Sequence, residues 1–206
     1  MTAPWSFSPI YPITPEGVSR ESLRAWADAL IEGGARILQY RRKSASDLER
    51  YDDLAALLER ARPAGCKVIV DDRVDLCMIL EADGVHLGQD DLPALEARRL
   101  LGPSKIIGVS THSLEQALEA EDLPVDYLAL GPVFPTSTKV NTDPVVPVAV
   151  QEIVLGRTRL PVVAIGGIRP EGARSLIARG FSSLAVIGAL ASDPSKGWRE
   201  FLACMP

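Results

Sequence analysis

The chain has 206 residues, a length that suits one domain with a full hydrophobic core. Its formal net charge of −5 argues against a nucleic-acid-binding protein and against a protein that binds membrane surfaces, because both partners are polyanions. The three cysteines include no C-x-x-C pair, so neither a disulfide framework nor a thiolate zinc site is indicated, and without a membrane-length apolar run we expect a cytoplasmic protein.

Short runs rich in β-branched residues alternate with longer amphipathic stretches along the chain. The predicted strands span residues 7–13, 36–40, 67–71, 84–87, 105–109, 126–130, 161–165 and 183–187. The predicted helices follow at 19–32, 46–60, 74–81, 93–101, 113–121, 145–155, 170–178 and 189–202. Eight such units predict a closed, parallel (β/α)8 barrel that occupies residues 1–206 as a single domain. An open doubly wound sheet is the alternative, because alternation alone does not establish closure.

Several helix ends carry recognisable signals. Ser19 and Ser46 can cap exposed backbone amides, and Glu49, three residues after Ser46, completes a capping box. Pro170 suits a first helical turn, and Gly180 suits a helix end.

Polar residues concentrate in the loops that follow the predicted strands. In a parallel barrel these loops converge on one rim, so residues distant in sequence can meet there. The loops concerned contain residues 39–43, 71–72, 88–91, 110–112, 131–139, 166–167 and 188. The opposite rim has no comparable set, and we therefore expect the functional site on the first rim.

Arg41, Arg42 and Lys43 place three cations together in an otherwise acidic chain. Such a group suits a phosphate or diphosphate, which needs charged donors to offset its desolvation. The alternative is a solvated loop that leads into a helix, the commoner role of a run of charges.

Asp72 and Asp91 follow neighbouring predicted strands. Two carboxylates on adjacent loops suit Mg²⁺, which completes its octahedron with water and phosphate oxygens. As an alternative, Asp72 could cap the third helix and Asp91 the fourth.

Gly166-Gly167 and Ile187-Gly188 follow the seventh and eighth strands, where barrels often bind phosphate through loop amides. Gly166-Gly167 could equally be a tight turn. The long, hydroxyl-rich loop at 131–139 ends in a lysine and is typical of a binding loop.

The two histidines offer little support for hydrolytic chemistry, because the sequence shows no recognisable pair of nucleophile and base. His112 could carry a proton, but a local hydrogen bond or a helix cap is the favoured interpretation. His86 lies inside a predicted strand and is expected to be part of the core.

Taken together and in order, these segments resemble the thiamine-phosphate synthase family. The resemblance rests on Gln39-Tyr40-Arg41-Arg42-Lys43, Asp71-Asp72-Arg73-Val74-Asp75, the run 82–91, Gly108-Val109-Ser110-Thr111-His112, the run 131–139 and Ala164-Ile165-Gly166-Gly167-Ile168. It covers roughly residues 11–202, and it is specific as a set rather than in any single motif.

The resemblance implies a Mg²⁺-dependent transferase of thiamine biosynthesis that acts on two small molecules, an aminomethylpyrimidine diphosphate and a thiazole phosphate. It implies loss of pyrophosphate to give a pyrimidine-methyl cation, which the thiazole nitrogen traps. The implied metal ligands are Asp72 and Asp91. The implied diphosphate ligands are Gln39, Arg41, Lys43, Asp71, Ser110 and Lys139. Thr136, Thr138, Gly167, Ile187 and Gly188 are implied to hold the thiazole phosphate.

We add Tyr40, Arg42 and Ser137 to the substrate-binding set, since they lie in the same loops. Arg41, Lys43, Ser110 and Lys139 are the expected catalytic residues, because leaving-group stabilisation matters more in this reaction than a strong base does.

Two positions depart from the family pattern, which usually has Asn at Asp71 and Ser at Gly188. The Asp71 carboxylate either repels the diphosphate or joins the Mg²⁺ shell, and the second is favoured because a carboxylate tolerated there needs a cation to offset it. Gly188 removes a phosphate-binding hydroxyl.

Two other functions stay open, a thiazole-phosphate tautomerase of the same barrel family and a non-catalytic thiazole-phosphate-binding protein. The sequence is compatible with a homo-oligomer and does not indicate which thiazole is the natural substrate.

Overall fold

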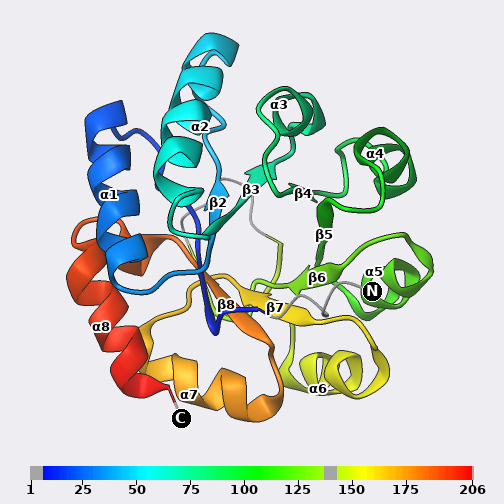
Figure 1. Cartoon of the computed structure of the whole chain (residues 1–206). Coiled ribbons are helices and arrows are strands. Elements are labelled where there is room, and N and C mark those ends of the chain that lie inside the picture. Colours follow the sequence, from blue (N-terminus) through cyan, green and yellow to red (C-terminus); the bar gives the residue numbers. More distant parts are fainter. Residues whose placement is uncertain (1–6, 137–142, 206) are drawn as a thin grey trace.

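The computed structural model describes residues 7–136 and 143–205. Within them, eight strands form one parallel sheet in the order β1-β8-β7-β6-β5-β4-β3-β2. A parallel bridge between Ile13 and Gln39 joins the edge strands, and the Thr14 amide donates to the Gln39 carbonyl at 2.9 Å. The sheet therefore closes into the predicted (β/α)8 barrel, with the helices in a ring outside the strands (Figure 1). The strands are β1 (Ile10–Pro12), β2 (Ile37–Tyr40), β3 (Lys67–Asp71), β4 (Gly84–Leu87), β5 (Ile106–Thr111), β6 (Tyr127–Leu130), β7 (Val162–Ile165) and β8 (Ser183–Val186).

The helices confirm most of the expected ends. Ser19 caps α1, Ser46 and Glu49 form the capping box of α2, and Gly180 ends α7 in the left-handed conformation that favours glycine. The helices are α1 (Arg20–Glu32), α2 (Asp47–Ala61), α3 (Val74–Ile79), α4 (Ala94–Leu101), α5 (Leu114–Glu119), α6 (Val148–Arg157), α7 (Pro170–Arg179) and α8 (Pro194–Cys204), with short 3-10 helices η1 (Ala120–Asp122) and η2 (Gly188–Leu190).

The predicted start of the last helix, 189–202, was wrong. The chain first forms η2, and α8 begins only at Pro194, where the Asp193 side chain accepts from the Lys196 amide at 2.9 Å. An Asp followed by Pro is itself a helix-start signal. Gly188 is the first residue of η2, directly after Ile187 at the end of β8.

The core has two parts. One lies between the strands and the helices, and the other fills the barrel with inward-facing residues that include Tyr11, Ile69, Tyr127 and Val163. Because side chains alternate along a strand, this pattern fixes which residues near the strand ends point inward. On β2 to β5, the polar residues that face inward near the mouth are Gln39, Asp71, His86 and Ser110.

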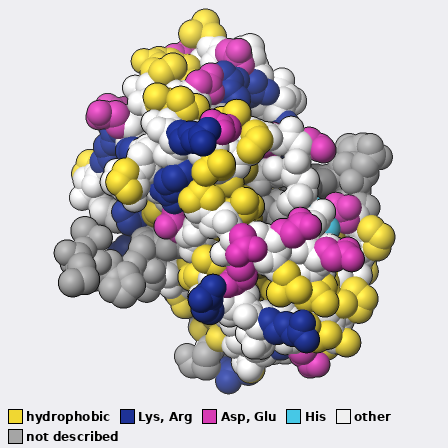
Figure 2. Space-filling view, turned by 90° about the vertical axis from the view of Figure 1, so that its right-hand side faces the viewer, with side chains coloured by type: hydrophobic (Ala, Val, Ile, Leu, Met, Phe, Trp, Pro, Cys, Tyr) yellow, Lys and Arg dark blue, Asp and Glu magenta, His cyan; other side chains and the backbone are white. Residues whose placement is uncertain are grey.

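On the face drawn in Figure 2, acidic and basic side chains alternate with apolar ones. In the part of the chain that the structure describes, none of the helices combines the length and the apolar character needed to cross a membrane.

Candidate active site

The loops after β2 and β3 bring cations and carboxylates together, as the sequence predicted. Lys43 Nζ lies 2.9 Å from Asp72 Oδ2 and 4.0 Å from Asp71 Oδ2. Arg41 Nε lies 3.4 Å from Asp71 Oδ2. Arg41 and Lys43 therefore offset the Asp71 carboxylate without a metal ion.

Asp72 and Asp91 form a hydrogen-bonded pair at this edge of the mouth. Asp72 has a φ of 60°, a conformation that non-glycine residues adopt at a cost, and Asp91 Oδ2 accepts from the Gly88 amide at 2.6 Å. Neither aspartate caps a helix, because the residues at the cap positions of α3 and α4 are Arg73 and Pro93. The capping interpretation was therefore wrong for both aspartates.

Burial and charge act in opposite directions on this group. Burial disfavours the charged form of Asp72, but hydrogen bonds to Asp91 and Lys43 outweigh it and lower the pKa of Asp72. Burial and the neighbouring Asp72 raise the pKa of Asp91. Burial also works against the Lys43 ammonium, yet Asp72 and Asp71 raise the pKa of Lys43. The group therefore holds one firmly charged carboxylate and one firmly charged ammonium.

Glu16, in the loop after β1, is a residue that the sequence reasoning missed. Its carboxylate lies 3.0 Å from Arg41 Nη1 and accepts from the Lys43 amide at 2.7 Å and from the Ser44 hydroxyl at 3.1 Å. The sequence could have indicated Glu16 as a site residue, because it follows the first strand and so lies on the same rim as the other candidates. Glu16 fixes the course of the loop that presents Arg41 and Lys43.

Arg42 and Tyr40 lie apart from the group formed by Arg41 and Lys43. The Arg42 guanidinium pairs with the buried carboxylate of Asp53 on α2, which also pairs with Arg20. Tyr40 belongs to the core between strands and helices, and it lines a cavity of about 150 Å³ together with Arg42 and Lys43. Alternation along β2 explains this, because Gln39 and Arg41 point inward while Tyr40 points outward.

Gln39 and Ser110 both point into the barrel interior and make hydrogen bonds there. Gln39 Nε2 donates to Tyr11 Oη at 3.2 Å, and Ser110 Oγ lies 2.9 Å from His86 Nε2. His86 is buried, as expected. The structure thus connects both residues to the polar interior of the barrel.

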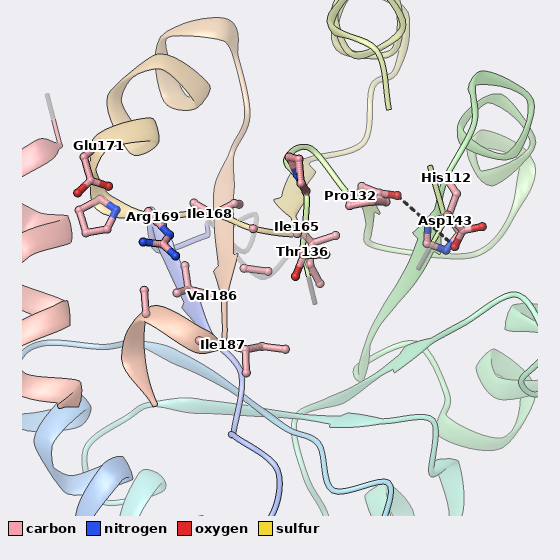
Figure 3. A pocket seen from close by; sticks show the side chains of 18 of the residues that line it. His112, Pro132, Thr136, Asp143, Ile165, Ile168, Arg169, Glu171, Val186 and Ile187 are labelled. Atoms are coloured by element: carbon pink, nitrogen blue, oxygen red, sulfur yellow. Dashed lines mark hydrogen bonds and ion pairs between the residues drawn. The ribbon is translucent and has the colours of Figure 1, made fainter. Parts of the chain in front are cut away.

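A cavity of about 540 Å³ lies at the ends of β6, β7 and β8 (Figure 3). The predicted Thr136, Gly167, Ile187 and Gly188 all line it. At Gly167, with φ of 64°, an added Cβ would lie 2.3 Å from the Pro135 carbonyl oxygen. Glycine is therefore required there both by its conformation and by the close approach of the neighbouring loop. The predicted Ser137, Thr138 and Lys139 lie outside the described residues.

His112 lines the same cavity and sits beside Asp143, as Figure 3 shows. Its Nδ1 lies 2.6 Å from the Gly131 carbonyl oxygen and 3.5 Å from Asp143 Oδ2. A carbonyl oxygen only accepts, so Nδ1 carries a proton. Ser113, not His112, caps α5, which excludes the cap interpretation. The His112 ring bonds instead to Gly131 on a different loop.

The donor set at Asp72 and Asp91 fits a magnesium ion. Among the described residues there is no group of three or more His, Cys, Asp or Glu side chains placed to hold a metal, and Asp72 and Asp91 form a pair of carboxyls. Mg²⁺ is commonly held by one or two carboxylates and takes its other ligands from water and phosphate. Two carboxyls that hydrogen-bond to each other form an arrangement in which a divalent cation can replace the shared proton.

Comparison with known proteins agrees with the resemblance seen in the sequence. Residues 10–190 match the family model described as thiamine monophosphate synthase. The chain is 44% identical over 178 residues to a thiamine-phosphate synthase from Chlorobium luteolum, covering 85% of this chain and 84% of that protein. It is 41% identical over 199 residues to one from Chloroflexus aurantiacus, covering 94% and 91%.

A solved structure of thiamine phosphate pyrophosphorylase from Pyrococcus furiosus superimposes with a TM-score of 0.82 at 38% identity, covering 95% of this chain and 94% of that one. A structure described as native KDPGal, at a TM-score of 0.74 and 14% identity, shares the fold alone. The names of the relatives do not favour the tautomerase or the non-catalytic binding protein. The chain belongs to the thiamine-phosphate synthase family.

Proposed function

We propose that the chain is a Mg²⁺-dependent, cytoplasmic enzyme whose one catalytic domain joins a pyrimidine diphosphate to a thiazole phosphate across the barrel mouth. The proposal rests on one juxtaposition. Lys43 and the Asp72–Asp91 pair lie on one side of the mouth, and the cavity at β6–β8 lies on the other. Members of the family are transferases, and this arrangement offers separate places for a leaving group and for an acceptor.

The pyrimidine diphosphate would lie on the side of β2–β5. Arg41 and Lys43 present cations that can exchange Asp71 and Asp72 for diphosphate oxygens, while Gln39 and Ser110 supply neutral polar contacts. Asp72 and Asp91 would hold Mg²⁺, which when bound supplies positive charge to the departing pyrophosphate. These residues stabilise a leaving group, and none of the chemistry requires a strong base.

The thiazole phosphate would lie in the 540 Å³ cavity. Gly167 and Gly188 expose backbone there, and the start of α7 adds amide groups that favour an anion. The apolar side chains of Ile165 and Ile187 line the same space and suit a heteroaromatic ring. The thiazole nitrogen would then face the pyrimidine methylene as pyrophosphate leaves.

The test is release of pyrophosphate with both substrates, with each alone, and with Mg²⁺ withdrawn by EDTA and restored. We expect release only when both substrates and Mg²⁺ are present, in equal amounts with thiamine phosphate. Pyrophosphate release that does not change when Mg²⁺ is removed would contradict the metal assignment. Binding of thiazole phosphate without any turnover would contradict the catalytic function.

A further inference from the structure

Five polar side chains form a hydrogen-bonded chain through the interior of the barrel. It runs from Gln39 through Tyr11, Tyr127 and His86 to Ser110, and every member is buried. The two tyrosine hydroxyls lie 3.1 Å apart, His86 Nδ1 lies 2.9 Å from Tyr127 Oη, and His86 Nε2 lies 2.9 Å from Ser110 Oγ. Both ends of the chain belong to the proposed pyrimidine site, whereas the three middle residues have no part in the proposed chemistry.

The packing around this chain holds its rings in place. Gly108 lies under Tyr127, and a Cβ added to Gly108 would fall 2.0 Å from the Tyr127 Cζ atom. The absence of a side chain there lets Tyr127 cross the barrel to reach Tyr11. The His86 ring stacks on Tyr127 with centroids 5.5 Å apart and an angle of 25° between the planes. His86 therefore has little freedom to turn away from Ser110.

One direction of donation satisfies every hydrogen bond in this chain when it starts at the Gln39 amide. The Gln39 amide nitrogen donates to Tyr11 Oη. Tyr11 has one hydroxyl proton of its own, which it can direct to Tyr127. In this direction Tyr127 accepts that proton and gives its own to His86 Nδ1, 2.9 Å away. A neutral imidazole that accepts at Nδ1 carries its proton on Nε2, and this proton points at Ser110 Oγ.

We propose that His86 is a positioning residue, held as the Nε2–H tautomer, which commits the Ser110 hydroxyl proton to an acceptor atom of the pyrimidine diphosphate. Ser110 Oγ already accepts from His86, so its own proton is left for the mouth of the barrel. A diphosphate oxygen or a ring nitrogen can take that proton, whereas the amino group of the pyrimidine is chiefly a donor. The contact to substrate rests on the proposed function, but the tautomer of His86 does not.

The tautomer can be read directly, because the chain has only two histidines. Protein labelled with ¹⁵N-histidine gives two imidazole spin systems, and a His112→Gln variant assigns them. We expect His86 to be neutral with its proton on Nε2. A proton on Nδ1, or on both nitrogens, would overturn the proposal, because Tyr127 could not then donate to the ring. Tyr127→Phe should shift the His86 Nδ1 resonance and leave His112 unmoved, and an unshifted Nδ1 would also count against it.

Binding measurements without turnover test the contact to substrate. Ser110→Ala should weaken binding of Mg²⁺-pyrophosphate about tenfold, the effect of losing a hydrogen bond to a charged acceptor. If binding of the hydroxymethylpyrimidine alcohol weakens instead, the acceptor is a ring nitrogen and the donor role still holds. Unchanged affinity for both probes would refute the role of the Ser110 proton.

Two substitutions of His86 separate positioning from mere packing. His86→Gln places an amide N–H near the position of Nε2, so it should keep most of the affinity that Ser110→Ala loses. His86→Leu fills similar space without a donor and should behave like Ser110→Ala. If His86→Leu retains full affinity for both probes, His86 does not act through Ser110. Because these measurements need no catalysis, their failure is distinct from a failure of the proposed function.

Discussion

The two halves of the barrel mouth differ in what lines them. Around β2–β4 the lining consists of charged side chains that neutralise one another, such as Lys43 with Asp72 and Arg41 with Asp71. Around β6–β8 the cavity lining includes four glycines, Gly131, Gly166, Gly167 and Gly188, together with apolar side chains and a few charged ones. Under the proposed function, the charged side chains of the first half would exchange ion-pair partners when diphosphate and Mg²⁺ bind, whereas the second half offers a preformed cavity. The first half should therefore respond to changes of charge, and the second to added volume.

The largest expected effect comes from the carboxylate pair. Asp72→Asn and Asp91→Asn would each remove the charge of a proposed Mg²⁺ ligand at nearly constant volume, so turnover should fall on the order of a hundredfold while the fold persists. Steady-state rates at increasing Mg²⁺ measure this. Asp90→Asn is the matched control, since that side chain is exposed beside the pair and should leave the rate unchanged. Near-normal turnover in both variants would remove the metal assignment.

A larger side chain at a glycine tests the other half of the mouth, the cavity at β6–β8. Gly167→Ala forces a Cβ into a left-handed backbone and against the Pro135 carbonyl, which should raise KM for thiazole phosphate roughly thirtyfold. Affinity for pyrophosphate should not change. At Gly156, on α6 and outside the cavity, an added Cβ meets no atom within 4 Å, so Gly156→Ala serves as the control and should have little effect. If Gly167→Ala weakens binding of both substrates equally, the two halves of the mouth do not bind different ligands.

A substitution of Arg42 tests whether all three cations of the run 41–43 contribute to the charged group around β2–β4. Its guanidinium pairs with buried Asp53, so Arg42→Ala should lower the free energy of unfolding by roughly 1–2 kcal/mol, with Arg20 still pairing with Asp53. Catalysis should stay near the normal rate. Urea denaturation gives the stability, and Arg99→Ala, which breaks an exposed pair with Glu96, should cost no more than about 0.5 kcal/mol. A loss of pyrophosphate affinity in Arg42→Ala would return Arg42 to the substrate site.

The smallest effect concerns Asp71. Because Asp71 pairs with Arg41 and Lys43, Asp71→Asn frees both cations and should tighten pyrophosphate binding about fivefold, on the order of 1 kcal/mol. The Mg²⁺ dependence of the rate should superimpose on that of the parent protein. A higher Mg²⁺ requirement would instead place Asp71 in the metal shell. Asp75→Asn, at an exposed pair with Arg73, is the control.

The sequence predicted the barrel well because its signals are local and repeated. Alternation of strands and helices, capping residues and Gly180 each act within a few residues of one another. The sites of Asp72, Asp91 and Lys43 could be predicted because the rim rule converts position after a strand into proximity.

What the sequence did not reveal depends on direction and on distant partners. Arg42 is indistinguishable from Arg41 in composition, and only the alternation of β2 and the position of Asp53 on α2 separate them. Glu16 and Asp143 became visible only once their partners, Arg41 and His112, had been placed. The interior chain from Gln39 to Ser110 joins five strands, and no local pattern encodes it.

Gln39 also closes the barrel, since its backbone makes the bridge between β1 and β2. Gln39 therefore takes part both in closing the barrel and in the proposed pyrimidine site. Under the proposed function, partial opening of this bridge would move Gln39 away from the pyrimidine, and the bound pyrimidine would in turn stabilise the bridge by mass action. Local opening between Ile13 and Gln39 would therefore speed release of the pyrimidine.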